Sequence, residues 1–597
     1  MSKKRFSFLA LLIIHFSLLV GNASCAQPLN QKKQFTHQDS LRGSITPERA
    51  WWDVMRYDIA VSPDYNSKTI KGEVEILVKI LKKGSKMQID LQQPLMIDSI
   101  FLIHAKRSDP GTRKDVMDIK KEKISFTDDK DVHFLDLPET SLNSLQQLEI
   151  HYHGKPVEAI RPPWDGGWIW KKDDRGRPWM SVACQGRGAS VWYPCKDHQS
   201  DEPDSGATLS ISVPDTLVAV ANGRLREKIL HADHTATYTW AVVNPINNYN
   251  IVPYIGKYVT WHEDYKGEKG KLDCDYWVLD YNLEKAKQQF TQVPKMLKCL
   301  EYWFGPYPFY EDGYKLVESP HLGMEHQSAV AYGNKYRNGY AGKDLSESGW
   351  GLKWDFIIVH ESAHEWFANN ITTKDIADMW VHEGFANYSE ALFTECEYGK
   401  EAATDYVVGI RRLIQNDIPI IGPYGVNQEG SSDMYYKGGN MLHTIRQVIG
   451  NDEKFRQILR GLNKDFYHQT VTTKQIEDYI SRKSGIDLSK VFDQYLRTTQ
   501  IPTLEYYFIA DKKEKSKLRL YFRWIDCVKG FNMPVRVNLS KTLQALIKPE
   551  QEEWKSILTP LETPTDPDQL PDIRNRSYYI KWIENRKIVP PGKYIRD

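Results

Sequence analysis

The sequence WDFIIVHESAHEWFA at residues 354–368 carries the most specific pattern of this chain. His360 and His364 are four residues apart, so on a helix they point from the same face about one turn apart. One tetrahedral zinc ion can bridge two imidazoles at that separation. Glu361 would lie beside the metal without binding it, where its carboxylate can take a proton from a zinc-bound water. The pattern therefore predicts a zinc hydrolase.

A third metal ligand is expected from a second helix. Glu383 follows nineteen residues after His364, too far along the chain for the same helix. Asn369-Asn370 offers a stop for the first helix, and residues 380–393 have the pattern of a second one that can return a carboxylate to the metal. We therefore expect one zinc ion per chain, with His360, His364 and Glu383 as ligands and a fourth position for water.

The composition is that of a large globular protein. The chain has 597 residues, of which 41% are hydrophobic and 12% aromatic, so it can bury several cores and should form roughly three domains. The formal net charge of +1 removes any general electrostatic attraction to nucleic acid or to an anionic membrane surface. We expect no nucleic-acid partner, and the sequence does not indicate an oligomeric state.

The N-terminus has the form of a secretory signal. Basic residues at 3–5 precede an apolar run at 6–20, and small residues follow. Residues 1–26 are therefore predicted to be a signal peptide, and the mature protein, without a transmembrane helix, is expected to be periplasmic or secreted. Lipoprotein processing at Cys25 is the alternative, although Asn22 replaces the usual aliphatic residue. The protein would then be anchored to the envelope by lipid.

The other cysteines are scattered and form no CxxC pair. This spacing argues against a cysteine zinc site and against a dense disulfide framework. Cys184 and Cys195 are close enough in sequence for one local bridge in an oxidising compartment. Buried free thiols are the alternative for both.

Four patterns succeed one another after the signal. Residues 27–46 are polar and aperiodic, which predicts a flexible lead-in. Short runs that alternate apolar and polar residues fill 47–257 and predict an antiparallel β domain. Residues 258–498 are mostly helical in pattern and contain the metal motif, and the β pattern returns over 499–597 as a small sandwich. The predicted fold class is a multidomain α+β protein.

These motifs resemble those of the M1 (gluzincin) zinc metallo-aminopeptidases. The family signature of HExxH, eighteen intervening residues and Glu is met by His360, Glu361, His364 and Glu383. The resemblance covers nearly the whole mature chain. It implies an N-terminal β saddle, a thermolysin-like catalytic domain and a C-terminal β sandwich. Thermolysin-type endopeptidases use a similar zinc arrangement, so this signature does not separate exopeptidase from endopeptidase.

The run Leu322-Gly323-Met324-Glu325-His326 resembles the family's GxMEN exopeptidase motif. The resemblance assigns Gly323, Met324 and Glu325 to substrate binding. A buried carboxylate can hold the charged α-ammonium of a substrate at a fixed distance from zinc, an anchor that an acylated or mid-chain residue cannot use. Leu322 and His326 replace the usual glycine and asparagine, which leaves the geometry of the substrate strand open.

Two further elements resemble the family. The sequence YYKG, which begins at Tyr435, matches the YxKG element, whose tyrosine hydroxyl can donate to the developing oxyanion without changing the net charge. The register selects Tyr435, with Tyr436 as the alternative. Gln185, nine residues before Pro194, lies in a segment similar to the one by which the family's N-terminal domain reaches the first substrate pocket. An amide that satisfies a strand edge is the alternative for Gln185.

The predicted function is that of a zinc-dependent aminopeptidase. It would hydrolyse the N-terminal residue from peptides with a free amine, with Glu361 as general base. Three alternatives stay open: a zinc endopeptidase that also cuts N-acetylated substrates, an epoxide-opening relative that uses the same zinc, and a non-catalytic peptide-binding protein of the same fold. The intact Glu361 argues against the last of these, because binding alone needs no base beside a metal.

Overall fold

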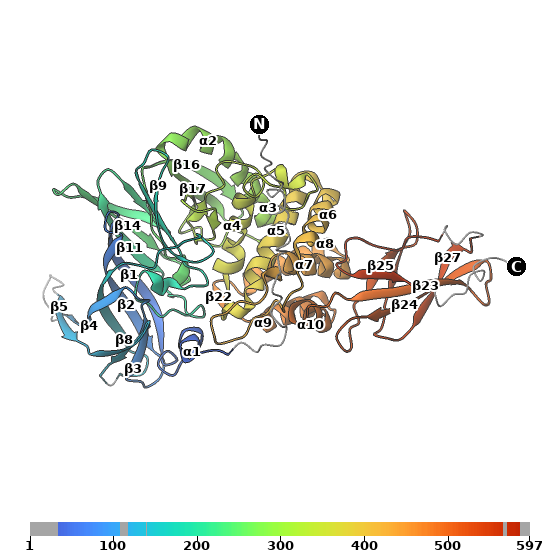
Figure 1. The fold of residues 1–597 in the computed structure, drawn as a ribbon, viewed down its shortest axis with the longest axis horizontal. Coiled ribbons are helices and arrows are strands. Elements are labelled where there is room, and N and C mark those ends of the chain that lie inside the picture. The colour runs from blue at the N-terminus through green and yellow to red at the C-terminus, as the bar shows by residue number, and fades with distance from the viewer. Residues whose placement is uncertain (1–33, 108–116, 139, 565–569, 586–597) are drawn as a thin grey trace, which may run out of the picture.

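The computed structural model describes residues 34–107, 117–138, 140–564 and 570–585, arranged in three parts that lie in a row (Figure 1). A β-rich N-terminal part stands at one end, a mostly helical part lies in the middle, and a smaller β part forms the other end. The predicted signal peptide, including Cys25, lies outside the described residues. None of the helices in the described part of the chain combines the length and apolar character that a membrane span requires.

The N-terminal part is built on an eight-stranded sheet in the order β13-β14-β11-β1-β2-β8-β4-β5. Alternate residues of its strands face a common core, as the period of two in the sequence predicts. All its neighbours pair antiparallel except β1 and β11, which run parallel. The strands are β1 (Trp52–Asp64), β2 (Thr69–Ile80), β4 (Met96–Arg107), β5 (Met117–Lys123), β8 (Leu145–Gly154), β11 (Ala207–Pro214), β13 (Arg224–Leu230) and β14 (Thr235–Val242).

Two smaller sheets complete this part. A three-stranded sheet has the order β3-β7-β6, and a four-stranded sheet has the order β12-β15-β10-β9. The loop that leaves β10 carries Gln185 toward the middle of the molecule. The strands are β3 (Lys86–Asp90), β6 (Phe126–Asp129), β7 (Val132–Asp136), β9 (Gly167–Lys172), β10 (Pro178–Ala183), β12 (Val218–Val220) and β15 (Tyr254–Gly256).

A short helix, α1 (His37–Gly43), lies within the segment predicted to be a flexible lead-in. Thr36 and Asp39 close it with a capping box, in which each side chain accepts from the other residue's backbone N–H. Arg49 is fully buried just after the helix and pairs with Asp90 at 2.5 Å. This segment is therefore ordered and not flexible as predicted. It lacks hydrophobic periodicity because its contacts are mainly polar.

The end of α1 packs against the middle part of the molecule. A Cβ placed on Gly43 would stand 2.0 Å from the backbone nitrogen of Asn427, so only glycine allows this approach. The carbonyl oxygen of Gly43 also lies 3.3 Å from Nε2 of His198. The segment thus contacts both the N-terminal part and a loop of the helical part.

The middle part combines a five-stranded sheet, in the order β16-β17-β18-β20-β19, with a group of helices. The strands are β16 (Tyr258–Gly267), β17 (Gly270–Leu279), β18 (Tyr314–Glu318), β19 (Gly323–Met324) and β20 (Val330–Tyr332). The helices are α2 (Leu283–Gln289), α3 (Val293–Phe304), α4 (Phe356–Ala363), α5 (Trp380–Tyr398), α6 (Lys400–Gly409), α7 (Tyr436–Ile449), α8 (Asp452–Asp465), α9 (Thr473–Ser484) and α10 (Ser489–Arg497).

Helices α5 and α7 meet at a contact between two glycines. A Cβ on Gly438 would stand 3.1 Å from the Cα of Gly384, and a Cβ on Gly384 would stand 3.4 Å from the Cα of Gly438. The approach at Gly438 is tighter than most real Cβ contacts, and a Cβ on Gly384 would also stand 3.3 Å from the carbonyl oxygen of Met434, so both positions favour glycine. Since Gly384 follows Glu383 and α7 begins just after Tyr435, this contact brings the two predicted site residues toward each other.

The C-terminal part contains a four-stranded sheet, β27-β24-β23-β28, and the pair β25-β26. Buried side chains of both sheets belong to the same apolar cluster as those of the helical part. The hydroxyl of Tyr495 on α10 donates to the carbonyl of Tyr579 at 2.7 Å across the boundary. The strands are β23 (Thr503–Ala510), β24 (Lys517–Ile525), β25 (Val535–Asn538), β26 (Gln544–Ile547), β27 (Lys555–Glu562) and β28 (Lys581–Glu584).

One disulfide joins two helices of the middle part. Cys299 on α3 is bonded to Cys396 on α5 across a sequence separation of 97 residues. Cys184 and Cys195 are both buried free thiols, which decides between the two alternatives that their spacing left open. The pairing found here joins residues far apart in sequence, where spacing gives no guidance.

We expect replacement of Cys299 and Cys396 by serine to lower the stability of the middle part. Closing a loop of this length restricts the unfolded chain, and loss of a native disulfide costs about 2–5 kcal/mol. Thermal unfolding followed by circular dichroism should show a lower Tm for C299S/C396S, and the wild type in reducing agent should match it. The control is Cys527→Ser, which removes a free thiol. An unchanged Tm in reducing agent would contradict the role of the bridge.

Candidate active site

A cavity of about 440 Å³ opens where the N-terminal and helical parts meet. All nine residues that the sequence and its resemblance propose for the site line this cavity: His360, Glu361, His364, Glu383, Tyr435, Glu325, Gln185, Gly323 and Met324. The other lining residues are Pro163, Trp164, Leu322, Tyr340, Phe356, Ile357, Asn387, Glu390, Glu429, Ser432 and Tyr436.

The three predicted metal ligands come from two helices and converge. His360 lies in the last turn of α4, His364 follows the end of that helix, and Glu383 lies in the first turn of α5. All three are buried, and one donor atom of each lies within 4.8 Å of the others. Glu383 Oε2 is 3.5 Å from His360 Nε2 and 3.4 Å from His364 Nε2.

The second nitrogen of each imidazole already has a hydrogen-bond partner. His360 Nδ1 lies 2.8 Å from Glu390 Oε1, and His364 Nδ1 lies 3.0 Å from the carbonyl oxygen of Phe367. Phe367 lies in an irregular turn after α4, in which Ala368 adopts a φ of +140°. Both imidazoles are therefore oriented with Nε2 toward Glu383, the arrangement in which metal-binding histidines are held.

The donor set fits a divalent metal ion. Glu383 Oε2 is buried and accepts no hydrogen bond from the described residues, although it faces two ring nitrogens. Burial alone would raise the pKa of Glu383, but the fields of His364 and His360 hold it well below its ordinary value, so the carboxylate stays charged. A buried charge without a hydrogen-bond partner needs a cation, and two imidazoles with one carboxylate are ligands that zinc accepts.

Glu361 lies beside this cluster and not within it. Burial raises the pKa of its carboxyl to about 7, against the opposing fields of His360 and His364. A carboxyl with a pKa near neutrality can both accept and return a proton. Strand β19 passes directly over it, because a Cβ on Gly323 would stand only 2.6 Å from Glu361 Oε1. A side chain in place of this glycine would have to displace the Glu361 carboxylate.

Glu325 is buried and held by residues of the N-terminal part. Gln185 Nε2 and the hydroxyl of Tyr249 both donate to Glu325 Oε1, the latter at 3.1 Å. Asn369 Nδ2 donates to the backbone carbonyl of Glu325 at 2.8 Å. One oxygen of Glu325 lies within 4.8 Å of donor atoms of Glu361 and His364. The carboxylate is therefore fixed close to the metal cluster.

The two departures from the family motif keep the strand ordered. Nδ1 of His326 hydrogen bonds to the hydroxyl of Tyr254, which comes from β15 of the N-terminal part. The carbonyl of Leu322 accepts from the backbone N–H of Gly333 at 2.8 Å. Burial lowers the pKa of His326 well below its ordinary value, so the ring is neutral. The replacements thus leave Glu325 pointing into the cavity.

Tyr435 precedes α7, and its ring stacks on that of His360 with centroids 6.1 Å apart. Burial and then the charges of Glu383 and Glu429 keep the pKa of Tyr435 well above its ordinary value, so its hydroxyl is a donor. Tyr436 has different neighbours, foremost Glu390. Of the two tyrosines, Tyr435 is the one whose hydroxyl lies among the charged groups of the cluster.

Two family models match this chain. The peptidase M1 N-terminal domain matches residues 54–249, and the peptidase family M1 domain matches residues 288–495. This chain belongs to peptidase family M1. The second match includes the whole metal cluster, Glu325 and Tyr435, and the first includes Gln185 and Tyr249.

Three named proteins are among the curated relatives of this M1 protein. Aminopeptidase N of Lactobacillus helveticus is 25% identical over 88% of this chain and 60% of its own length. Puromycin-sensitive aminopeptidase of Caenorhabditis elegans is 22% identical over 75% of this chain and 47% of its own length. Leukotriene A-4 hydrolase of Xenopus laevis is 24% identical over 52% of this chain and 51% of its own length. The chain spans about half the length of the curated relatives it matches.

Solved structures share the fold of this M1 protein. The M1 zinc metallopeptidase of Deinococcus radiodurans matches with a TM-score of 0.62 and 20% identity, over 76% of this chain and 95% of that one. Aminopeptidase A of Legionella pneumophila matches with a TM-score of 0.69 and 15% identity, over 89% of this chain and 59% of that one. The likeness confirms the predicted multidomain α+β fold, with a β-rich N-terminal domain and a helical domain that carries the site.

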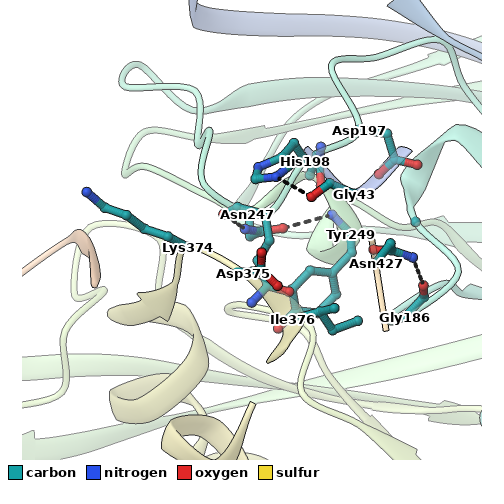
Figure 2. A pocket seen from close by; sticks show the side chains of 13 residues that line it. Gly43, Gly186, Asp197, His198, Asn247, Tyr249, Lys374, Asp375, Ile376 and Asn427 are labelled. Atoms are coloured by element: carbon teal, nitrogen blue, oxygen red, sulfur yellow. Dashed lines mark hydrogen bonds between the residues drawn. The ribbon is translucent and has the colours of Figure 1, made fainter. Parts of the chain in front are cut away.

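Three residues of the site were not found from the sequence of this M1 protein. Glu390 lies on α5 two turns after Glu383, a spacing that places both on one helix face and could have indicated it. Tyr249 lies in a 3-10 turn of three residues (Asn248–Asn250) and Glu429 in a loop, where spacing carries no such signal. Tyr249 also lines a cavity of about 30 Å³ between the two domains, beside Gly186 and Asn427 (Figure 2).

We expect Glu390→Gln to weaken zinc binding by roughly ten- to hundredfold, because partners that orient a metal-binding histidine contribute that much. Glu390 accepts from Nδ1 of His360, and an amide can present its nitrogen there and turn the ring. Zinc affinity should be measured by competition with a fluorescent chelator. Glu397→Gln, on the same helix but paired with Lys295, is the control. Equal affinity in both variants would show that Glu390 does not orient the ring.

Proposed function

We propose that this protein is a zinc-dependent aminopeptidase, which releases the N-terminal residue from peptides with a free amino group. The observation that carries the proposal is Glu325, a buried carboxylate whose oxygen lies within 4.8 Å of donor atoms of Glu361 and His364. Such a carboxylate binds an ammonium group and excludes an acylated one. The names of two relatives, aminopeptidase N and puromycin-sensitive aminopeptidase, support the same activity.

His360, His364 and Glu383 would hold the zinc ion. When bound, zinc supplies a Lewis acid, which lowers the pKa of water and polarises a peptide carbonyl. Glu390 and the carbonyl of Phe367 keep the two imidazoles turned toward this position. The remaining chemistry belongs to side chains that do not bind the metal.

Glu325 binds the α-ammonium of the substrate, and Gln185 with Tyr249 keeps the anchoring carboxylate in one rotamer. Because the anchor and the base Glu361 are held at a short separation, only the first peptide bond can lie beside the base. One residue is therefore released in each turnover, whatever the length of the peptide beyond it.

Glu361 takes one proton from the attacking water, whose oxygen forms the new bond to the carbonyl carbon. The hydroxyl of Tyr435 donates to the carbonyl oxygen as negative charge develops on it. Glu361 then gives the proton to the peptide nitrogen, and the carbon–nitrogen bond breaks. The free amino acid and the shortened peptide leave, and Glu361 returns to its starting protonation state.

We also propose that the protein is exported, as the N-terminal sequence predicts. The disulfide between Cys299 and Cys396 supports an oxidising compartment, since structural disulfides are rare in the cytoplasm of most organisms. Lipid attachment at Cys25 would be detected as a mass increase of the mature N-terminal peptide.

We expect the zinc-loaded protein to hydrolyse aminoacyl p-nitroanilides with a free amine and to leave their N-acetylated forms intact. Glu325→Ala should lower kcat/KM by roughly ten- to hundredfold, the value of a lost charged hydrogen bond. Addition of a strong chelator should abolish hydrolysis, and zinc should restore it. Cleavage of the acetylated series would instead indicate an endopeptidase. No cleavage of either series by zinc-loaded protein would favour a binding role.

A further inference from the structure

Glu429 lines the catalytic cavity but has no part in the mechanism above. It lies in the loop before Tyr435 and is partly exposed to the cavity. No hydrogen bond or ion pair joins its carboxylate to any residue that the structure describes. We propose that Glu429 selects a basic side chain, lysine or arginine, at the N-terminal position of the substrate. This inference rests on the proposed aminopeptidase function and names the substrates that such an enzyme would prefer.

The position of Glu429 is on the side of the cavity that holds the substrate amine. Its Oε1 lies 3.5 Å from the point where a Cβ on Gly186 would stand, and Gly186 follows Gln185, which donates to Glu325. Burial, and then the charges of Glu383 and Glu325, raise its pKa to about 7. The side chain of the N-terminal residue branches from the carbon that carries the ammonium, so it extends into this region.

Glu429 nevertheless stands apart from the reacting groups. Among described residues, oxygen atoms of Glu325 and Glu361 lie within 4.8 Å of each other and of a His364 nitrogen, whereas Glu429 belongs to no such group. We therefore place the α-ammonium at Glu325 and the cation at the far end of a lysine or arginine side chain at Glu429.

The balance of charge in the cavity favours a second substrate cation. Glu325, Glu361, Glu383 and Glu429 all line it, and no described lining residue is lysine or arginine. Glu390 also lines it, but three donors already surround its carboxylate. The metal ion is expected at Glu383 and the α-ammonium at Glu325. Neither cation pairs with Glu429, and a lysine or arginine side chain would supply its partner.

The loop holds Glu429 in place before any substrate binds. A Cβ on Gly430 would stand 2.0 Å from the carbonyl oxygen of Ile420, so the loop is folded tightly on itself. Asn427 Nδ2 donates to the carbonyl of Gly186 at 2.8 Å, which ties the loop to the N-terminal domain (Figure 2). The backbone N–H of Ser431 donates to the carbonyl of Pro419 at 3.0 Å. A carboxylate held in this way gains selectivity because little ordering is needed on binding.

The test compares substrates that differ in charge and little in shape. Lysyl and norleucyl 7-amido-4-methylcoumarin form one pair, and the arginyl and citrullyl compounds form the second. We expect the zinc-loaded wild type to show a charged-to-neutral ratio of kcat/KM of roughly ten or more, and Glu429→Gln to reduce this ratio roughly tenfold. Glu284→Gln, an exposed position on α2, is the control and should keep the wild-type ratio.

A binding measurement keeps the result independent of turnover. Lysinamide and norleucinamide are titrated by calorimetry into zinc-loaded Glu361→Gln and into the same protein with Glu429→Gln added. The ratio of the two Kd values should fall in parallel with the ratio of kcat/KM.

A wild type without preference for the charged member of each pair overturns the proposal. An equal loss on both members in Glu429→Gln overturns it as well, because that result assigns Glu429 to the ammonium or to the fold. Failure of the wild type to cleave any free-amine substrate overturns the proposed function instead. The Kd ratio then still decides whether Glu429 recognises a basic side chain.

Discussion

A buried carboxylate oxygen that faces two imidazoles without a hydrogen bond is the constraint on which this structure depends. Glu383 is buried at the wall of the catalytic cavity, where an unpaired charge is unfavourable. His364 and His360 offset that cost in part and keep Glu383 ionised, while Glu390 and the carbonyl of Phe367 orient the two imidazoles. Helices α4 and α5 are therefore packed around a position that a cation must complete.

Both domains contribute residues that the site needs. The helical domain supplies the metal ligands and the base, and the N-terminal domain supplies Gln185 and Tyr249, which hold Glu325. Glu325 itself directly follows strand β19, whose glycine lies against Glu361. Recognition of the amine and activation of water are thus joined through one short strand. Separation of the two domains would leave the metal ligands in place but release the group that selects the substrate end.

Much of this site could be predicted from the sequence because its parts obey local rules. Helical spacing places His360 and His364 on one face, and the matched motifs indicated Glu325 and Tyr435. The motif did not show why Tyr435 lies next to the metal cluster. The reason is the contact of Gly384 with Gly438, which brings α7 against α5.

What could not be predicted depends on contacts between distant segments. The partner of Cys299 is 97 residues away, and the parallel pairing of β1 with β11 joins strands that no local pattern relates. Glu429 lies in a loop and Tyr249 in a 3-10 turn too short to show a period. The polar contacts of α1 replace the apolar stripe that would have indicated a helix. In each case the missing information is the tertiary partner.

The position of α1 has a consequence for how the N-terminal segment can be cut. Its last residue, Gly43, packs against the backbone of Asn427, in the loop that also carries Glu429 of the catalytic cavity. The segment around α1 therefore supports the cavity wall and is not an expendable extension. Proteolytic trimming beyond Thr36 would remove that support and loosen the wall. A protease that processes this N-terminus too far would then alter which substrates are accepted, while the metal ligands stay untouched.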